Sequence, residues 1–200
     1  DSLFLLAKDQ CRPFDRDRSG INLGEGAGFL VLQSDKSRKR SGSQALATIS
    51  GFGVRNDAYH ATSTSPNARG LTAAMSEALL LAELRPTEID YVNAHGTATP
   101  NNDLTEGVAL QRVFGERMPY FSSTKAFTGH TLAAAGAIEG IFSILALQHQ
   151  VIPPNLNFEH PIEQHGLVPQ QESITAKVEH TMSNSMGMGG YCSTVIFSKI

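Results

Sequence analysis

The sequence of 200 residues contains no tryptophan and only two cysteines, Cys11 and Cys192. Two cysteines cannot form the disulfide framework of a small secreted domain, and these two do not form a C-x-x-C pair. A reducing compartment is therefore the expected environment, and we predict a cytoplasmic location.

The sequence also lacks a large excess of charge of either sign, because its formal net charge is only -3. A nucleic-acid-binding protein needs a basic surface, so this balance argues against a nucleic-acid partner. The exception is the basic run KSRKR at residues 36–40. A short run of this kind is typical of a solvated helix end or loop, and a docking patch for an acidic carrier or for nucleic acid is the alternative.

Long hydrophobic runs are absent too. The longest apolar stretch, residues 131–147, contains Glu139 and is interrupted by small residues. Because a bilayer-spanning helix needs about 20 consecutive apolar residues, we expect no membrane span. No signal peptide is recognisable. The chain begins without methionine, at DSLFLLAKDQ, which suggests a fragment or a processed product.

What the sequence does contain is an alternation of strand and helix patterns, which is typical of α/β layering. Strands are predicted at residues 45–54, 89–95, 120–124, 176–184 and 192–200, with two more around a glycine-rich turn in 20–33. Helices are predicted at 67–84, from 102 or 103 to 115, and at 129–148. Gly51 and Gly53 indicate a bulge or a close backbone approach in the first of these strands. A composition break at 41–43 divides the chain into residues 1–44 and 45–200.

Three polar stretches follow predicted strands: NAHGTATPNND, STKAFTGH and NSMGMGG. Ligands of α/β sheets bind outside the carboxyl ends of the strands. His95 ends one predicted strand, Lys125 ends the next, and His130 begins the helix after it. Glycine and threonine around them leave space and supply N–H and O–H donors, so these three are the candidate catalytic residues.

Other kinds of site fit the same residues less well. No cysteine or second histidine lies at metal-ligand spacing from either histidine, and Lys125 would repel a divalent ion, so no metal is predicted. A Ser-His-Asp hydrolase using Ser122 or Ser123 with Asp103 is an alternative, but the GxSxG motif is absent. GEGAG at residues 24–28 is not followed by a predicted helix, which argues against a phosphate-binding loop.

Taken together, NAHGTATPNNDLTE, SSTKAFTGHTLAAAGAIEG and NSMGMGG resemble the β-ketoacyl-acyl-carrier-protein synthases, the condensing enzymes of fatty-acid and polyketide synthesis. CRPFDRDRSGINLGEGAGFLVL and VIPPNLN are similar to the same family. The resemblance implies an α/β fold of the thiolase-like type, with helices layered around a mixed five-stranded sheet in each of two related halves. Residues 1–44 would end the first half, and residues 45–200 would form the second.

The resemblance also implies an acyltransferase activity: decarboxylative Claisen condensation of an acyl thioester with malonyl-carrier protein. His95 and His130 match the paired histidines that stabilise the enolate formed by loss of CO₂. Lys125 matches the lysine that orients the second histidine and a buried carboxylate, and Glu139 matches that carboxylate. We expect neutral histidines, with the tautomer fixed by backbone N–H groups of the following glycine and threonine residues.

Further site residues follow from the same resemblance. The threonines that hydrogen-bond the phosphopantetheine arm are matched by Thr62, Thr97 and Thr99, although Thr62 is equally well explained as a structural hydroxyl. Asn184 matches a loop-supporting residue, and the backbone N–H of Met188 corresponds to a donor of the acyl oxyanion hole. Asp103 and Glu106 are expected to brace the histidine loop as a helix cap and a first-turn acid. No cofactor of its own is expected, because phosphopantetheine arrives on the carrier protein.

The sequence departs from the family pattern in three places. Met186 and Met188 stand where phenylalanines are usual, and flexible methionine predicts an unusual acyl-chain preference. Tyr191 and Cys192 replace a Thr-Asn pair, which weakens the expectation of loop bracing and of a bound cation. The nucleophilic cysteine of the family lies upstream of residue 1, and neither Cys11 nor Cys192 matches it. We therefore expect that this chain alone cannot load an acyl group.

The implied partners are an acyl carrier protein, the missing N-terminal half, and a second subunit in a homodimer or heterodimer. One alternative function is a catalytically silent subunit similar to a chain-length factor, and another is a non-catalytic structural or dimerisation lobe. Silent subunits lose the catalytic residues, whereas both histidines and the lysine are present here. The active condensing enzyme is therefore the favoured prediction.

Overall fold

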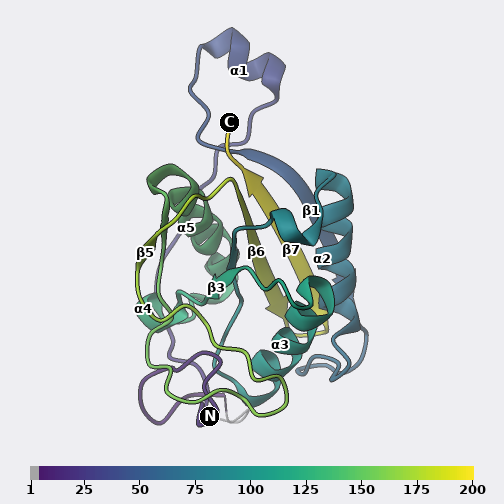
Figure 1. Ribbon diagram of the computed structural model, residues 1–200, viewed down its shortest axis with the longest axis vertical. Helices are drawn as coiled ribbons and strands as arrows, with labels where there is room; N and C mark the ends of the chain where they lie inside the picture. The colour runs from purple at the N-terminus through teal and green to yellow at the C-terminus, as the bar shows by residue number, and fades with distance from the viewer. Residues whose placement is uncertain (1–4) are drawn as a thin grey trace.

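The computed structural model describes residues 5–200, and residues 1–4 of the predicted segment 1–44 lie outside the described residues. A mixed five-stranded sheet lies at the centre, in the order β1-β7-β6-β2-β3, with helices on both faces (Figure 1). Strands β1 (Thr48–Asn56), β7 (Tyr191–Ser198) and β6 (His180–Gly187) are antiparallel neighbours, and β2 (Tyr91–Asn93) is parallel to both β6 and β3 (Tyr120–Ser122). A small second sheet pairs β4 (Val151–Ile152) with β5 (Ile174–Thr175).

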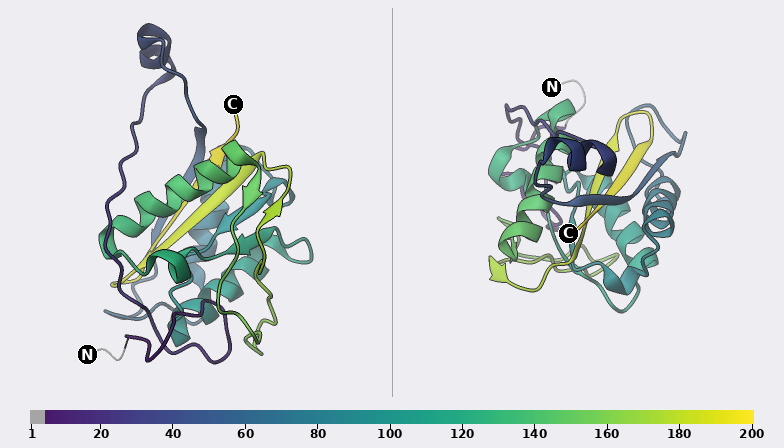
Figure 2. Two further views of the ribbon diagram at one scale, coloured as in Figure 1. Left: turned by 90° about the vertical axis from the view of Figure 1, so that its left-hand side faces the viewer. Right: turned by 90° about the horizontal axis from the view of Figure 1, so that it is seen from above.

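The helices form a layer on each side of this sheet (Figure 2). One side carries α2 (Arg69–Ala82) and α3 (Pro100–Phe114), and the other carries α5 (Ala135–His149). The shorter helices are α1 (Asp35–Ser41), η1 (Pro86–Glu88), α4 (Lys125–Thr128) and η2 (Leu132–Ala134). Successive residues of β2 point to opposite faces of the sheet and belong to two separate hydrophobic cores. Val92 packs with the α2–α3 layer, and Tyr91 packs with the α5 layer. The alternation of side chains along a strand therefore builds two cores from one sheet.

The glycines of β1 set its distance from α2, and the sequence predicted a bulge or a close backbone approach at these positions. A Cβ atom on Gly51 would lie 2.1 Å from the Ala78 carbonyl oxygen, and one on Gly53 would lie 2.1 Å from the Ala74 carbonyl oxygen. The pairing register with β7 shifts between Ile49 and Gly51. The strand therefore has both of the features that the sequence offered as alternatives.

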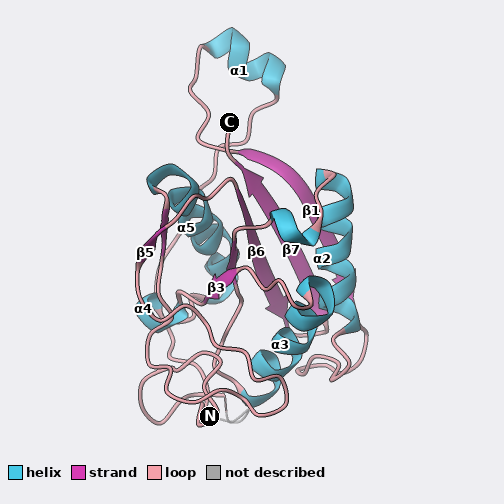
Figure 3. Cartoon of the chain, in the orientation of Figure 1, coloured by secondary structure: helices cyan, strands magenta, loops and turns pink. Residues whose placement is uncertain are grey.

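The prediction of two strands within residues 20–33 was wrong. This segment is extended but is drawn as loop in Figure 3, and its pairing is limited to isolated bridges of Ile21 and Leu23. A strand needs a neighbour to bond, and the apolar side chains of Phe29 and Val31 are each 88% exposed. The segment therefore has a sequence typical of a strand, but it forms no ladder with another strand among the described residues.

Two predicted helix starts were also wrong. Helix α3 begins at Pro100 after Thr99, because proline is favoured in the first turn, so Asn102 and Asp103 lie inside the helix and do not cap it. The predicted helix at 129–148 is interrupted: Gly129 has a φ of 69°, and α5 begins only at Ala135. Within NSMGMGG, residues 184–187 belong to β6, so only the end of this motif is a turn.

One helical segment is long and apolar enough to cross a membrane by length and composition alone. It comprises the 18 residues Leu132–His149 and has a mean hydropathy of 1.4. Its acidic residue, Glu139, is buried and bonded to Lys125, and α5 packs against β6 and β2. A helix in the core of a globular domain meets the same criterion, because its apolar face packs against a sheet.

We predict that Gly53→Ala destabilises the protein by about 1–3 kcal/mol, because the added methyl group overpacks the contact with α2. Urea unfolding of the full-length protein measures the effect. Gly187→Ala is the matched control, because its Cβ would meet Tyr191 at an ordinary 3.5 Å. Equal unfolding midpoints for the two variants would contradict this account of the β1–α2 contact.

Candidate active site

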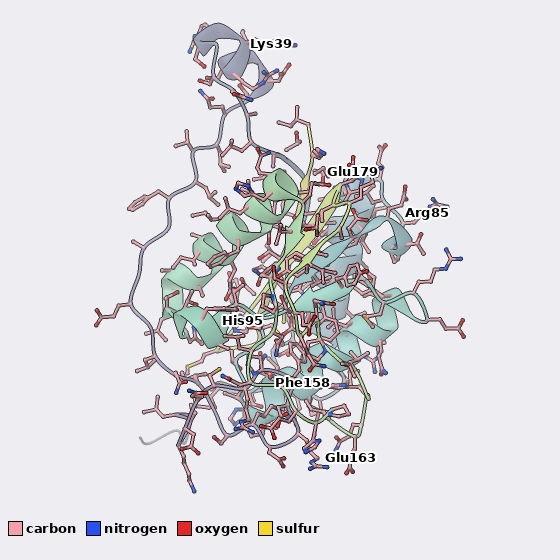
Figure 4. The ribbon with its side chains drawn as sticks, turned by 60° about the vertical axis from the view of Figure 1, so that its left-hand side comes forward. Lys39, Arg85, His95, Phe158, Glu163 and Glu179 are labelled. Carbon is pink, nitrogen blue, oxygen red and sulfur yellow. The ribbon has the colours of Figure 1, made fainter. Side chains whose placement is uncertain are left out.

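The candidate catalytic residues come together where two parallel strands end. His95 follows β2 by two residues, and Lys125 begins α4 after β3. Because β2 and β3 are parallel neighbours, the loops after them leave the same edge of the sheet. Figure 4 shows His95 in the interior of the molecule, well away from Lys39 on the protruding α1. His130 follows α4 and completes the group.

The two histidine rings lie edge to face, with centroids 5.4 Å apart and planes at 86°. His95 is 4% exposed, and both rings line a cavity of about 240 Å³. Its other lining residues include some from the loops after β1 and β2, from the end of β6 and from the turn that follows it: Thr62, Thr97, Thr99, Met186 and Met188. Side chains that are far apart in the sequence therefore surround one cavity.

Lys125 is bonded to His95 and not to His130 as the resemblance implied. Its ammonium donates to His95 Nδ1 at 3.1 Å, to the His95 carbonyl oxygen and to Glu139 Oε1. Both charged side chains are buried, at 1% and 3% exposure. Because Nδ1 of His95 accepts this bond, the ring proton lies on Nε2.

His130 is held by backbone groups. Its Nδ1 accepts the backbone N–H of Leu132 at 3.1 Å, so its ring proton also lies on Nε2. Its own backbone N–H donates to the Asn22 carbonyl oxygen at 2.7 Å, and its carbonyl oxygen accepts from Gly24 N–H at 3.1 Å. The expected donors for the two rings, N–H groups of the following glycine and threonine residues, are thus replaced by Leu132 N–H and the Lys125 ammonium.

Both histidines are neutral at pH 7. Burial, the charge of Lys125 and the neighbouring His130 hold the pKa of His95 well below its ordinary value. Burial and Lys125 lower the pKa of His130 to about 4. The cavity therefore presents two imidazole N–H groups that carry no net charge.

Glu106 has a larger part in the site than a first-turn acid would have. It is fully buried, and its carboxylate accepts the backbone N–H groups of His95 at 2.9 Å and Gly96 at 2.8 Å. Asn184 donates its side-chain amide to the same carboxylate at 3.3 Å. Burial raises the pKa of Glu106 to about 7, and the two backbone N–H donors oppose that rise.

Asp103 supports the next part of the same loop. Its carboxylate accepts Phe14 N–H at 2.7 Å and Ala98 N–H at 3.1 Å. Ala98 has a φ of 63°, which is costly for a residue with a Cβ atom and needs the support of such bonds, whereas the φ of 37° at Gly96 is readily adopted by glycine. Asp103 and Glu106 thus brace the loop, as expected, although neither is the helix cap.

The remaining candidates lie at the cavity with different exposures. The hydroxyls of Thr97 and Thr99 are 2.9 Å apart, while the Thr62 hydroxyl pairs with His60 Nδ1 at 3.4 Å. Met188 is 59% exposed. The structure brings these side chains to one cavity, and their roles in binding stay predictions.

Neither cysteine lies among the residues that line this cavity. Both are buried as free thiols. Burial raises the pKa of Cys11 to about 11 and that of Cys192 to about 12. A thiol reacts as its thiolate, so neither has the properties of a nucleophile.

A sequence model described as the beta-ketoacyl synthase C-terminal domain matches residues 46–159. The chain belongs to the beta-ketoacyl synthase family. It is 43% identical over 199 residues to the mitochondrial 3-oxoacyl-[acyl-carrier-protein] synthase of Arabidopsis thaliana, a match that covers 96% of this chain and 43% of that protein. The chain spans about half the length of the curated relatives it matches.

Solved ketosynthases share the fold. A structure described as the ishigamide ketosynthase/chain length factor superposes with a TM-score of 0.94 at 36% identity, over all of this chain and 49% of that one. A structure described as a type II polyketide synthase acyl-carrier protein in complex with its ketosynthase superposes with a TM-score of 0.93 at 29% identity, and the match covers all of this chain and 51% of that one. The expected thiolase-like α/β fold is thereby confirmed.

We predict that His130 makes the stability of this beta-ketoacyl synthase domain depend on pH. Its pKa is about 4 in the folded state and ordinarily 6.5, so the unfolded state binds the proton more readily between these values. The stabilisation is present above pH 6.5 and is lost as pH falls towards 4, by at most about 1.4 kcal/mol per pH unit.

The measurement is the free energy of unfolding of the wild type and of His130→Gln at several pH values between 7 and 4. The advantage of the wild type over the variant should shrink as pH falls. His160 is exposed, and His160→Gln is the matched control, for which the difference should stay constant. A constant difference for His130→Gln as well would contradict the neutral state of this half-buried ring.

Proposed function

We propose that the protein containing this chain is a 3-oxoacyl-[acyl-carrier-protein] synthase that acts in fatty-acid or polyketide synthesis. The observation that carries the proposal is the pair of neutral histidines lining one cavity, each with its Nδ1 accepting a hydrogen bond. Each ring then keeps one N–H donor free for a ligand. Family membership supports the same assignment.

The two donors suit the stabilisation of an enolate. When a malonyl thioester loses CO₂, the electron pair of the broken C–C bond moves onto the thioester oxygen as negative charge. Two imidazole N–H groups stabilise that oxygen by hydrogen bonds, and donors fixed in advance need no reorganisation. The depressed pKa of each histidine suits a donor that does not take up a proton from solvent. The buried ammonium of Lys125 adds positive potential behind His95.

The second step forms a carbon–carbon bond. The enolate carbon attacks an acyl thioester held on a cysteine, and the cysteine leaves as a thiolate. Because both cysteines of this chain are buried and neither lines the cavity, we propose that this cysteine belongs to the part of the protein outside these residues. The backbone N–H of Met188 is the proposed donor to the acyl oxygen. No cofactor or metal of the protein's own takes part in the proposal.

The proposed partners follow from the relatives. One similar structure is described as an acyl-carrier protein in complex with its ketosynthase, and another as a ketosynthase with a chain length factor. We propose that an acyl carrier protein delivers the substrates on phosphopantetheine and that the protein is a homodimer or heterodimer. A cytoplasmic location agrees with the two free thiols. The presence of His95, His130 and Lys125 favours an active subunit over a silent chain-length-factor-like one.

We predict that His95→Ala and His130→Ala each lower malonyl decarboxylation by about 10²–10³-fold, because each removes one donor to the enolate oxygen. Acyl transfer to the cysteine should fall less. CO₂ release from malonyl-carrier protein by the full-length protein measures the first effect. The exposed His149 provides the control, His149→Ala, which should behave as wild type. Near wild-type CO₂ release in either variant, or none from the wild type, would refute the proposal.

We predict that Met188→Phe narrows the range of acyl-chain lengths that the protein accepts. Met188 lines the cavity and is largely exposed, and a ring has fewer rotamers than a thioether chain with which to make room. The product-length distribution from a mixture of acyl thioesters measures the change. Met118→Phe, away from this cavity, is the matched control. An unchanged distribution for Met188→Phe would contradict the proposed role in chain selection.

A further inference from the structure

A buried histidine that the proposed mechanism does not use packs against helix α3. His165 is 7% exposed and lies in the turn that Glu163 marks in Figure 4. A Cβ atom on Gly107 of α3 would lie 2.3 Å from His165 Cδ2 and 2.4 Å from His165 Nε2. The imidazole therefore occupies the space that the side chain of any other residue at position 107 would need. Because glycine is among the least favoured residues inside a helix, this contact gives a reason for its presence.

Hydrogen bonds fix the orientation of this ring on α3. The backbone N–H of Leu167 donates to His165 Nδ1 at 3.1 Å, and the side-chain amide of Gln111 donates to the His165 carbonyl oxygen at 2.7 Å. Gln111 follows Gly107 by one helical turn, so both contacts lie on the same face of α3. The ring proton lies on Nε2, which faces the backbone of Asp103 but forms no hydrogen bond of normal geometry within the described residues. The ring thus meets the helix through its shape.

The part of α3 that the ring contacts is also the part that supports the histidine loop. Asp103 lies one turn before Gly107, and Glu106 is its neighbour in the sequence. Their carboxylates accept backbone N–H groups of the loop 95–98 at distances of 2.8 to 3.1 Å. Such bonds weaken steeply when donor and acceptor move out of line. A displacement of α3 at Gly107 would therefore reach the backbone of His95.

We propose that His165 is a positioning residue that acts on His95 through helix α3. Its ring, seated on Gly107, sets the position of the helix turn that carries the two supporting carboxylates. These carboxylates then hold the loop so that the His95 ring presents its N–H to the thioester oxygen. The effect of His165 on catalysis rests on the proposed function, whereas its effect on the loop does not.

The first test compares the two half-reactions of the full-length protein. For His165→Ala, we expect malonyl decarboxylation to fall about 10-fold, less than the ~10²-fold loss that a misplacement of 1 Å can cause. Acyl transfer to the cysteine should change less, because it does not depend on the enolate donors. His165→Asn keeps an acceptor for Leu167 N–H but removes the ring from Gly107, so it should behave like His165→Ala. Equal falls in both half-reactions, or wild-type decarboxylation in either variant, would overturn the proposal.

The reciprocal variant tests the contact itself. Gly107→Ala places a methyl group against the ring, so decarboxylation should again fall about 10-fold. In the His165→Ala background the ring is gone and alanine suits a helix better than glycine, so the same substitution should raise the rate. Residues in contact can produce such a reversal, whereas independent residues act additively. The exposed His160 provides the matched control, His160→Ala, which should behave as wild type. A fall of the same size from Gly107→Ala in both backgrounds would contradict the proposal.

Hydrogen exchange of backbone amides separates the positioning role from the proposed reaction, because it requires no turnover. In the full-length protein, residues 95–98 should exchange about 10-fold faster in His165→Ala than in the wild type, while β6 and β7 keep their protection. Adding Gly107→Ala should restore part of the lost protection, a comparison that holds even if Gly107→Ala alone fails to fold.

The outcomes distinguish the two claims. If residues 95–98 lose protection in a protein whose wild type releases no CO₂, the positioning role stands and the proposed reaction fails. If these residues exchange as in the wild type, or if the whole chain exchanges faster to the same degree, the positioning role is wrong whatever the activity.

Discussion

The buried ion pair between Lys125 and Glu139 is the interaction on which the site depends. Removing either partner would leave a charge buried without compensation, which is among the most destabilising changes a core can suffer. The pair fixes α4 against α5, and the same ammonium also bonds the ring and the carbonyl oxygen of His95. One charged group thus holds three segments of chain, and it sets the tautomer and lowers the pKa of the ring it touches.

A second constraint acts on His95 from the opposite side. Glu106 binds the backbone N–H groups of His95 and Gly96, and Asp103 binds that of Ala98, so the carboxylates of α3 hold three residues of the loop from 95 to 98. Ala98, a residue with a Cβ atom at positive φ, needs such support. Asn184 joins Glu106 to the sheet, and Thr194 donates to the Asn184 side-chain oxygen at 2.8 Å. The ring and the backbone of His95 are therefore fixed by different elements.

Sequence patterns predicted the parts of this arrangement that depend on local chemistry. The strands before His95 and Lys125, the five-stranded α/β fold and the close β1–α2 contact all followed from periodicity, from glycine placement or from the family resemblance. The errors concern partners that lie elsewhere. Residues 20–33 look like strands, but in the described part of the chain they pair only through isolated bridges of Ile21 and Leu23, and His130, which was predicted to be helical, pairs with Leu23. Spacing alone could not show which histidine Lys125 contacts, nor that Glu106 turns inward.

The charges around the cavity distinguish the surroundings of the histidines from those of the two cysteines. Lys125 gives the histidine side of the cavity a positive potential, which favours negative charge on a bound oxygen and disfavours protonated imidazole. The cysteines lie in the opposite surroundings: burial and nearby carboxylates, Asp103 for Cys11 and Asp57 for Cys192, raise the pKa of each thiol. The same fold that holds two neutral imidazole N–H groups at the cavity thus keeps its own thiols protonated. This contrast is why the proposed reaction takes its nucleophilic thiolate from a segment outside these residues.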